Sequence, residues 1–281
     1  TTPAAASQLT LATQPSEAGR SGIALAAQPV VQLRDAFGNA APQAGIVVTA
    51  AIASGGGTLG GTVTATTHAR GVATFTDLVV SGPVGQRTLS FSATGLAGVT
   101  SGAIDLAAGT AASLAISAGD GQTAAAGSAV ATAPAVRVMD ASGNPVSGDS
   151  VVFAVASGGG SVAGASATTD AGRIAAVGSW TLGTAAGANT LTASSGSLTP
   201  ATFTATGVAG AAASLSIQSG DGGTATVATT RTLEAKVVDA HGNPVAGHTV
   251  SWAVATGGGS VGAPTSTTSA GGVASGTWSL G

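Results

Sequence analysis

Apolar and polar residues alternate in short stretches along this chain. Before the first Asp-x-x-Gly-Asn segment, the apolar residues Val31 and Leu33 stand on either side of the polar Gln32. A period of two predicts a β-strand with one buried and one exposed face. The same alternation recurs twice, in Val136, Arg137 and Val138 and in Ala235, Lys236 and Val237. The chain is therefore expected to consist of short strands.

Each of these strands runs into a five-residue segment that occurs three times and is called the DxxGN turn below. The three DxxGN turns begin at Asp35, Asp140 and Asp239, at spacings of 105 and 99 residues. Asp bonds its own downstream backbone, and Gly and Asn tolerate positive φ, so the segment predicts a tight reversal. A period near 100 residues, with strands on both sides of each turn, predicts tandem β-sandwich modules.

Further signals repeat in the same order after each DxxGN turn. A Val-rich strand comes next and ends in three glycines, which begin at Gly55, Gly158 and Gly257. A later strand carries an aromatic residue, and the pattern aligns Phe75 with Trp180 and Trp278. The inward face of the Val-rich strand is predicted to hold Val48, Ala50 and Ile52, then Val151, Phe153 and Val155, then Val250, Trp252 and Val254.

The predicted fold class is all-β, with three tandem immunoglobulin-like β-sandwich modules. The predicted boundaries are 1–109 for a divergent first module, 110–209 for the second and 210–281 for the third. Gly281 aligns with Gly183, and the second repeat continues for about another 25 residues beyond that point. The third module is therefore expected to lack its final strands and to expose an edge and half a core. On this basis the 281 residues are expected to be part of a longer chain.

Composition narrows the classes of function. Charged residues make up only 7% of the chain, the net charge is −3 and there is no cysteine. Nucleic-acid binding needs a basic stripe, which the eight scattered basic residues do not form. Without cysteine, a disulfide or thiolate metal site is excluded within this chain. No run of about 20 apolar residues occurs, so no membrane span is predicted. Abundant Thr, Ser and Gly favour an extracellular, cell-surface or periplasmic location.

The order of these signals carries a family resemblance over essentially the whole chain. Alternating apolar residues, a DxxGN turn followed by Pro145 or Pro244, the glycine triplet and the Trp-x-Leu-Gly strand resemble bacterial immunoglobulin-like modules of the invasin and intimin type, the Big-1 group. The first repeat departs from the pattern, with Phe75 in place of Trp and no Pro after Asn39. The resemblance implies β-sandwiches used in rows as a stalk or spacer on bacterial envelope proteins, and it implies no ligand.

Several segments match functional motifs, but a structural role is favoured over a functional site for each of them. Asp and Asn oxygens suit calcium, but each repeat offers one carboxylate at the DxxGN turn, so a turn is predicted there. Asp120 and Asp221, flanked by glycines, receive the same interpretation, while calcium at a module junction stays open. A G-x-S-x-G match around Ser260 and a G-x-G-x-x-G match at Gly55 lack the helix that such motifs need.

The histidines and tryptophans also favour structural interpretations. His68, His241 and His248 are scattered, so neither a zinc site nor a general base is predicted. The three tryptophans, Trp180, Trp252 and Trp278, could stack on carbohydrate but occur at repeat-matched strand positions, which favours a core. No catalytic, cofactor-binding or metal-binding residue and no cofactor is predicted.

The leading functional hypothesis is a non-enzymatic structural or spacer array, or adhesin stalk, of immunoglobulin-like modules in a bacterial surface or secreted protein. The alternative is a protein-binding accessory subunit that docks onto a larger cell-envelope complex through these modules. Partners would then be other proteins, either host proteins or subunits of that complex. The divergent first repeat, with Phe37 at its turn tip and Arg70 and Arg87 nearby in sequence, is the expected contact module. An enzymatic role would need a catalytic domain outside these residues.

Overall fold

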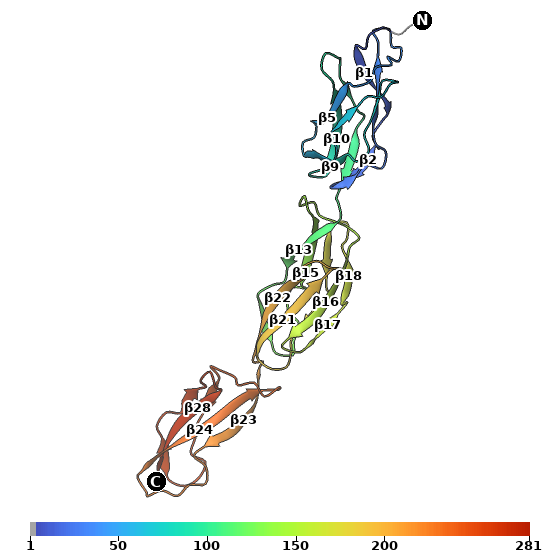
Figure 1. Ribbon diagram of the computed structural model, residues 1–281. Helices are drawn as coiled ribbons and strands as arrows, with labels where there is room; N and C mark the ends of the chain where they lie inside the picture. The colour runs from blue at the N-terminus through green and yellow to red at the C-terminus, as the bar shows by residue number, and fades with distance from the viewer. Residues whose placement is uncertain (1–3) are drawn as a thin grey trace. The chain divides into compact units, whose positions relative to one another are not determined.

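The computed structural model describes residues 4–281, and every regular element in that part of the chain is a β-strand (Figure 1). The all-β prediction is confirmed. The chain forms two compact units. The first comprises the residues up to Ala115 together with Arg137–Asp149 and Thr168–Ile174, and the second comprises Ile116–Val136, Ser150–Ala167 and Ala175–Gly281. The module boundaries at residues 109 and 209 stay a prediction, and the three stretches are called repeats below.

The first repeat folds into three sheets that enclose one core. Their strand orders are β1-β4-β8, β2-β12-β10-β5-β7 with β11 beside β10, and β3-β9-β6. Alternation along β4 and β10 sends Leu33 and Phe91 inward, where Phe91 lies 5.4 Å from Phe75 between ring centroids. The strands are β1 Gln8–Thr13, β2 Ala18–Arg20, β3 Ile23–Ala24, β4 Val30–Arg34, β5 Val47–Ser54, β6 Thr58–Gly60, β7 Thr64–Thr66, β8 Val72–Thr74, β9 Val79–Ser81, β10 Gly85–Ser92, β11 Val99–Thr100 and β12 Ile104–Ala107.

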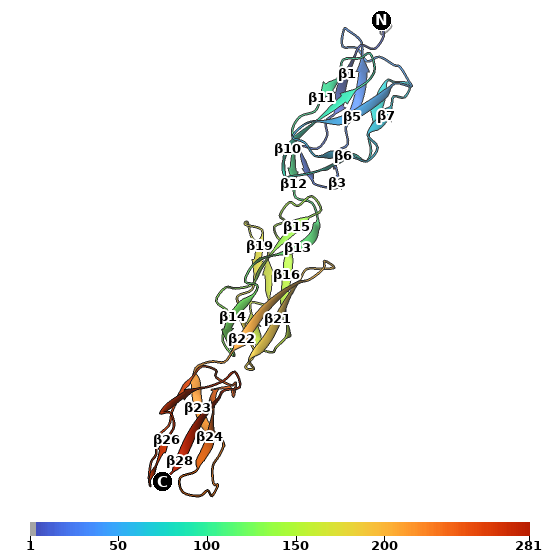
Figure 2. The ribbon, with the colours of Figure 1, turned by 90° about the vertical axis from the view of Figure 1, so that its left-hand side faces the viewer.

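The second repeat shows the same arrangement with a larger aromatic core. Its sheets are β13-β15-β19, β14-β22-β21-β16-β18 and β17-β20 (Figure 2). Trp180, Phe153 and Phe203 are all buried, and the two phenylalanine rings lie 6.4 Å apart. The strands are β13 Ala111–Ala118, β14 Gln122–Ala125, β15 Ala135–Asp140, β16 Ser150–Ser157, β17 Ser161–Ala163, β18 Ser166–Thr168, β19 Ile174–Ala176, β20 Ser179–Thr181, β21 Gly187–Ser194 and β22 Ala201–Val208.

The third repeat has a small core and one open side. Its sheets are β23-β24-β28-β26 and β25-β27, and β28 is the last strand of the described residues. Leu215 and Ile217 on β23 are 57% and 66% exposed. That the third module lacks its final strands stays a prediction. The strands are β23 Ala212–Ser219, β24 Thr230–Asp239, β25 Thr249–Ser251, β26 Gly259–Val261, β27 Thr265–Thr267 and β28 Val273–Leu280.

The predicted alignment of Phe75 with the tryptophans is wrong. Trp180 on β20 pairs with Val162 on β17, and Val80 on β9 makes the matching pair with Leu59 on β6. The backbone N–H of Phe75 instead bonds Pro29, as the N–H of Val177 bonds Pro134. Val80 therefore occupies the tryptophan position. The first repeat has two more residues than the second between its matching strands, and the shared aromatic character of Phe75 and Trp180 concealed this insertion.

Candidate functional site

The DxxGN turns have one local geometry in all three repeats. One carboxylate oxygen of the Asp, Oδ1, accepts the backbone N–H groups two and four residues further on. In the second repeat these donors are Ser142 at 2.9 Å and Asn144 at 2.8 Å, and the glycine between them, Gly143, has φ +78°. The Asp140 N–H in turn bonds the Asn144 carbonyl at 2.9 Å. The turn prediction is therefore confirmed.

The second carboxylate oxygen of each Asp holds the segment that leads into the repeat. Oδ2 of Asp140 accepts the N–H of Gly109 at 2.7 Å, and Oδ2 of Asp239 accepts the N–H of Gly210 at 2.8 Å. Both carboxylates are buried, with 4% of each residue exposed. Gly109 and Gly210 lie at the predicted module boundaries. The DxxGN turn thus fixes the path along which the chain enters its repeat.

The Asn of the second DxxGN turn reaches beyond its own repeat. Nδ2 of Asn144 donates to the carbonyl of Gly82 at 2.9 Å, and its Oδ1 accepts the N–H of Val84 at 2.9 Å. Gly82 and Val84 belong to the turn between β9 and β10, and all of these residues lie inside the first compact unit. Asn144 is only 5% exposed. A side-chain amide, with one donor and one acceptor side, therefore clamps a turn of the preceding repeat.

The third DxxGN turn repeats this contact inside the second compact unit. Nδ2 of Asn243 donates to the carbonyl of Thr184 at 2.8 Å, and its Oδ1 accepts the N–H of Ala186 at 2.7 Å. The turn that it holds lies between β20 and β21. In both clamps the amide therefore pairs with a carbonyl and an N–H two residues apart. Sequence reasoning missed this role, although the unchanging Asn of the DxxGN turn was a signal that could have pointed to it.

A side chain beneath each clamped turn supports it from the inside. Arg87 on β10 donates to the carbonyls of Pro83 and Gln86. In the second repeat Asn189 on β21 accepts the N–H of Gly183 at 3.0 Å and donates to Gly187. Arg87 is 4% exposed, so its expected place on a contact surface is wrong, whereas Arg70 is exposed. The guanidinium group of Arg87 thus donates to backbone carbonyls at the turn that Asn144 clamps.

Hydrogen bonding sets the ionisation of the DxxGN carboxylates. The side-chain hydrogen bond from Asn243, together with backbone N–H donors, holds the pKa of Asp239 well below its usual range. At Asp140 and Asp35 burial acts to raise the pKa, but the combined N–H donors outweigh it and leave the pKa lowered. Within residues 4–281 no three His, Cys, Asp or Glu side chains gather at one place. These carboxylates act as acceptors for backbone and amide N–H groups.

The remaining motif candidates lie apart from one another in the fold. Ser260 lies within β26, which pairs with β28, so its G-x-S-x-G match is a strand and not a strand–helix elbow. The Nδ1 of His68 accepts the N–H of Arg70 at 3.1 Å. His241 lies at an exposed turn tip, as expected, and Asp120 bonds the backbone N–H and hydroxyl of Thr204 on β22. None of these positions brings an acid, a base and a nucleophile together.

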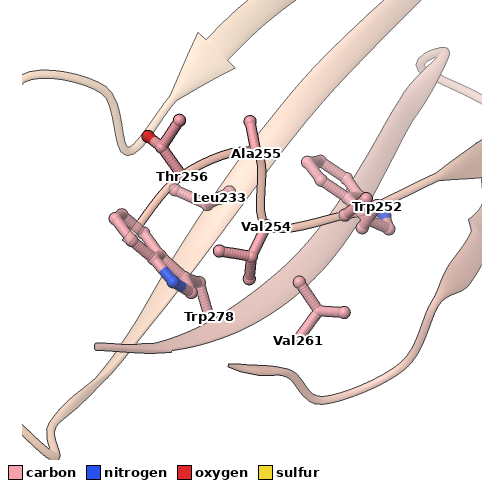
Figure 3. Close-up of a pocket in the computed structure, with 8 residues that line it drawn as sticks. Leu233, Trp252, Val254, Ala255, Thr256, Val261 and Trp278 are labelled. Atoms are coloured by element: carbon pink, nitrogen blue, oxygen red, sulfur yellow. The ribbon is translucent and has the colours of Figure 1, made fainter. Parts of the chain in front are cut away.

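The tryptophans differ in burial. Trp180 is fully buried, which confirms its predicted place in a core. Trp252 and Trp278 are half-buried and line an open groove together with Leu233, Val254 and Val261 (Figure 3). The groove has the character of an uncovered sandwich core, since only aliphatic and indole groups face it in Figure 3 apart from Thr256.

Comparison with known proteins places the fold. No protein-family model and no curated protein sequence matches the chain. Among solved structures, the chain is similar to FdeC, an adhesin of Escherichia coli, with 23% identity over 99% of this chain and 88% of that one and a TM-score of 0.50. Also similar are the adhesin InvE of Yersinia pseudotuberculosis, with 20% identity over 71% and 58% and a TM-score of 0.30, and the D0-D1 domain of intimin, with 21% identity over 71% and 95% and a TM-score of 0.27.

No helix long and apolar enough to cross a membrane occurs among residues 4–281. The strand arrangement, the buried sandwich cores and the similarity to the E. coli adhesin agree with one another. The chain therefore shares the immunoglobulin-like all-β fold of this bacterial adhesin, and the resemblance seen in its sequence is confirmed at the level of the fold.

Proposed function

We propose that this chain is a non-enzymatic spacer or adhesin stalk, an array of immunoglobulin-like modules in a bacterial surface or secreted protein. The observation that supports the proposal is the clamp formed by Asn144 and again by Asn243 on a turn of the preceding repeat. Structural likeness to an adhesin supports the same role. The proposed location is outside the cell, on its surface or in the periplasm.

The physical argument rests on the restraint of the connecting segments. A free Gly- and Ala-rich connection would bend easily. Here the N–H groups of Gly109 and Gly210 are held by buried carboxylates, and each following Asn adds two hydrogen bonds to the preceding repeat. Hydrogen bonds that involve a charged group contribute about 1.5–3 kcal/mol each. Such contacts limit bending of the connecting segments, and a spacer requires that restraint.

Distance distributions between spin labels test the proposal. The chain has no cysteine, so Thr66→Cys and Ala154→Cys, both at exposed positions, give two unique labels in the first and second repeats. Asn144→Ala removes the clamp on Gly82 and Val84 and is expected to broaden the measured distribution. Asn39→Ala is the matched control, since Asn39 holds no turn of another repeat among the described residues, and it is expected to leave the distribution unchanged. Equal widths in all three proteins would contradict the proposal.

One observation favours protein binding as a second function. The side chain of Phe37 is 84% exposed at the tip of the first DxxGN turn, and Arg70 is exposed as well. An exposed aromatic side chain offers a large apolar contact area to a partner. Under this proposal the partner is a host protein or an envelope-complex subunit. Cross-linking of the full chain from the cell envelope should then yield a stoichiometric partner that Phe37→Ser releases, and an unchanged yield would exclude Phe37 as the contact.

A further inference from the structure

We propose that the first DxxGN turn, Asp35–Asn39, is a docking surface for a further immunoglobulin-like module joined to the chain just ahead of Ala4. The proposal rests on the clamp described above for the second and third DxxGN turns. The proposed partner of Phe37 and Asn39 is a pair of turns from a module of the same kind. Three observations on the first repeat support it.

The path of the chain into the first repeat matches the other two junctions. The N–H of Ala4 bonds Oδ2 of Asp35 at 3.2 Å, just as the N–H groups of Gly109 and Gly210 bond their aspartates. Ala4 therefore takes the place of those linker glycines. A module joined ahead of Ala4 would emerge beside the DxxGN turn, as the preceding repeats do at the second and third turns.

The amide of Asn39 is oriented for a clamp that it does not make. Its Nδ2 bonds Oδ2 of Asp35 at 3.2 Å, the same bond that orients Asn144 and Asn243 at 2.9 Å. Asn39 is exposed, whereas Asn144 and Asn243 are 5% and 8% exposed. Among residues 4–281, Oδ1 of Asn39 accepts no hydrogen bond. The surface thus fits a turn that presents a carbonyl and, two residues later, an N–H.

The third residue of each DxxGN turn supplies a second contact. The hydroxyl of Ser142 lies 2.8 Å from that of Ser21, just after β2. His241 lies against Gly127, just after β14, where a methyl group on the glycine would come within 2.7 Å of its Nε2. Ser21 and Gly127 belong to matching turns of the first and second repeats. Phe37 occupies the same position in the first DxxGN turn, so its exposed ring would cover the matching turn of an incoming module.

Within the described residues, the two turns of this kind, Gly82 to Val84 and Thr184 to Ala186, are already held by Asn144 and Asn243. The N–H of Ala4 bonds its aspartate as those of Gly109 and Gly210 do, so a module that continues the chain ahead of Ala4 would reach the first DxxGN turn. The proposed occupant is therefore a module in the same chain, and a second copy is an outcome that the test distinguishes.

The experiment extends the full chain by one module. A copy of residues 110–209 replaces residues 1–3 and is joined directly to Ala4, because Ala209 precedes Gly210, the counterpart of Ala4. Cysteine labels replace Ala154 in the added copy alone and Thr66 in the first repeat. We expect a narrow distance distribution, which Asn39→Ala broadens roughly twofold because only a short, unclamped linker then remains. Phe37→Asp should broaden it as well.

The outcomes separate this proposal from the proposed function. If Asn39→Ala leaves the distribution in the extended chain unchanged while Asn144→Ala broadens that of the parent chain, the docking surface is wrong and the spacer proposal stands. If Asn144→Ala also leaves the distance distribution of the parent chain unchanged, the clamp does not limit bending and the spacer proposal is wrong as well. Analytical ultracentrifugation of the parent chain gives a third result, since a dimer that Phe37→Asp dissociates would overturn the proposal in favour of a second copy.

Discussion

The second and third repeats carry the same sequence signals but form different cores. Trp180 is fully buried and Phe153 is 1% exposed, whereas their counterparts Trp278 and Trp252 are half-buried. In the second repeat β21 pairs with β16 and β22 pairs with β21, which brings Phe203 to 6.4 Å from Phe153. The third repeat has no counterpart of these two strands among the described residues, and its β25 pairs with β27 alone.

This difference shows that an apolar strand pattern specifies an inward face but not its burial. Leu215 on β23 corresponds to Leu9 on β1, yet Leu9 is 3% exposed and Leu215 is 57% exposed. Burial of such residues needs the opposing sheet. Most of the stabilisation from the apolar face of a strand arises when the second layer removes it from water. Three comparisons between the two repeats test this view.

The largest expected difference is between two tryptophan substitutions. Trp180→Ala should destabilise the second repeat by about 3–5 kcal/mol, because it leaves a cavity in a closed core. Trp278→Ala should cost the third repeat only about 1–2 kcal/mol, since the half-buried ring removes less area from water. Native-state hydrogen exchange at the amides of Leu191 and Val237 measures each repeat separately. Equal losses at the two sites would show that the open side of the third repeat is covered in solution.

A smaller difference is expected at the first glycine of the glycine triplets. Gly158 and Gly257 have nearly equal φ angles, +84° and +81°, so alanine costs about 1–2 kcal/mol at either position through left-handed strain. A methyl group at Gly158 would also lie 2.4 Å from Oδ1 of Asn189 on β21, whereas at Gly257 nothing lies within 4 Å. Gly158→Ala should therefore cost about 1–3 kcal/mol more than Gly257→Ala, through overpacking.

Urea unfolding of the two glycine variants, followed by the same exchange measurements, gives the comparison. Asn189→Ala in the background of Gly158→Ala is the control, because it removes the nearest atom and leaves only the carbonyl of Ala188, at 2.8 Å. If the cost of Gly158→Ala relative to Gly257→Ala is undiminished in that background, contact with the Asn189 side chain is not its cause.

The smallest expected difference concerns acid stability. The backbone N–H of Thr204 on β22, together with its hydroxyl, lowers the pKa of Asp120 although burial opposes the shift. A carboxyl whose pKa is lower in the folded than in the unfolded state adds stability above its unfolded pKa of 3.8 and loses it as the pH falls through the folded pKa. In the Asp120→Asn protein the second repeat should therefore lose less stability than in the parent protein as the pH falls below about 4.

The third repeat has no counterpart of β22 among residues 4–281, so Asp221→Asn is the matched comparison and should change stability less than Asp120→Asn does. Thermal unfolding from pH 2 to pH 7, followed by circular dichroism, measures both variants. An equal change in the Asp221→Asn protein would show that the two aspartates share a role that does not depend on β22.

The DxxGN turns show how far local chemistry leads. Asp, Gly and Asn at fixed spacing predicted the reversal correctly, because the Asp carboxylate bonds backbone N–H groups only two and four residues away. The clamp could not be predicted in the same way, since Asn144 meets Gly82 and Val84 about 60 residues earlier in the chain. The burial of Arg87 was missed for the same reason, because its partners are the backbone carbonyls of a folded turn.

The sequence by itself determined the strand periodicity, the turns, the repeat spacing and the immunoglobulin-like fold, because these depend on interactions between residues that are near neighbours or repeat regularly. Tertiary structure alone decided that Val80 and not Phe75 takes the tryptophan position, that Trp278 lies at an open groove, and that the Asn of each later DxxGN turn binds the preceding repeat. The physical reason is that burial and hydrogen-bond partners between distant segments depend on which strands pair, and the alternation of apolar residues is the same whether or not a second layer covers them.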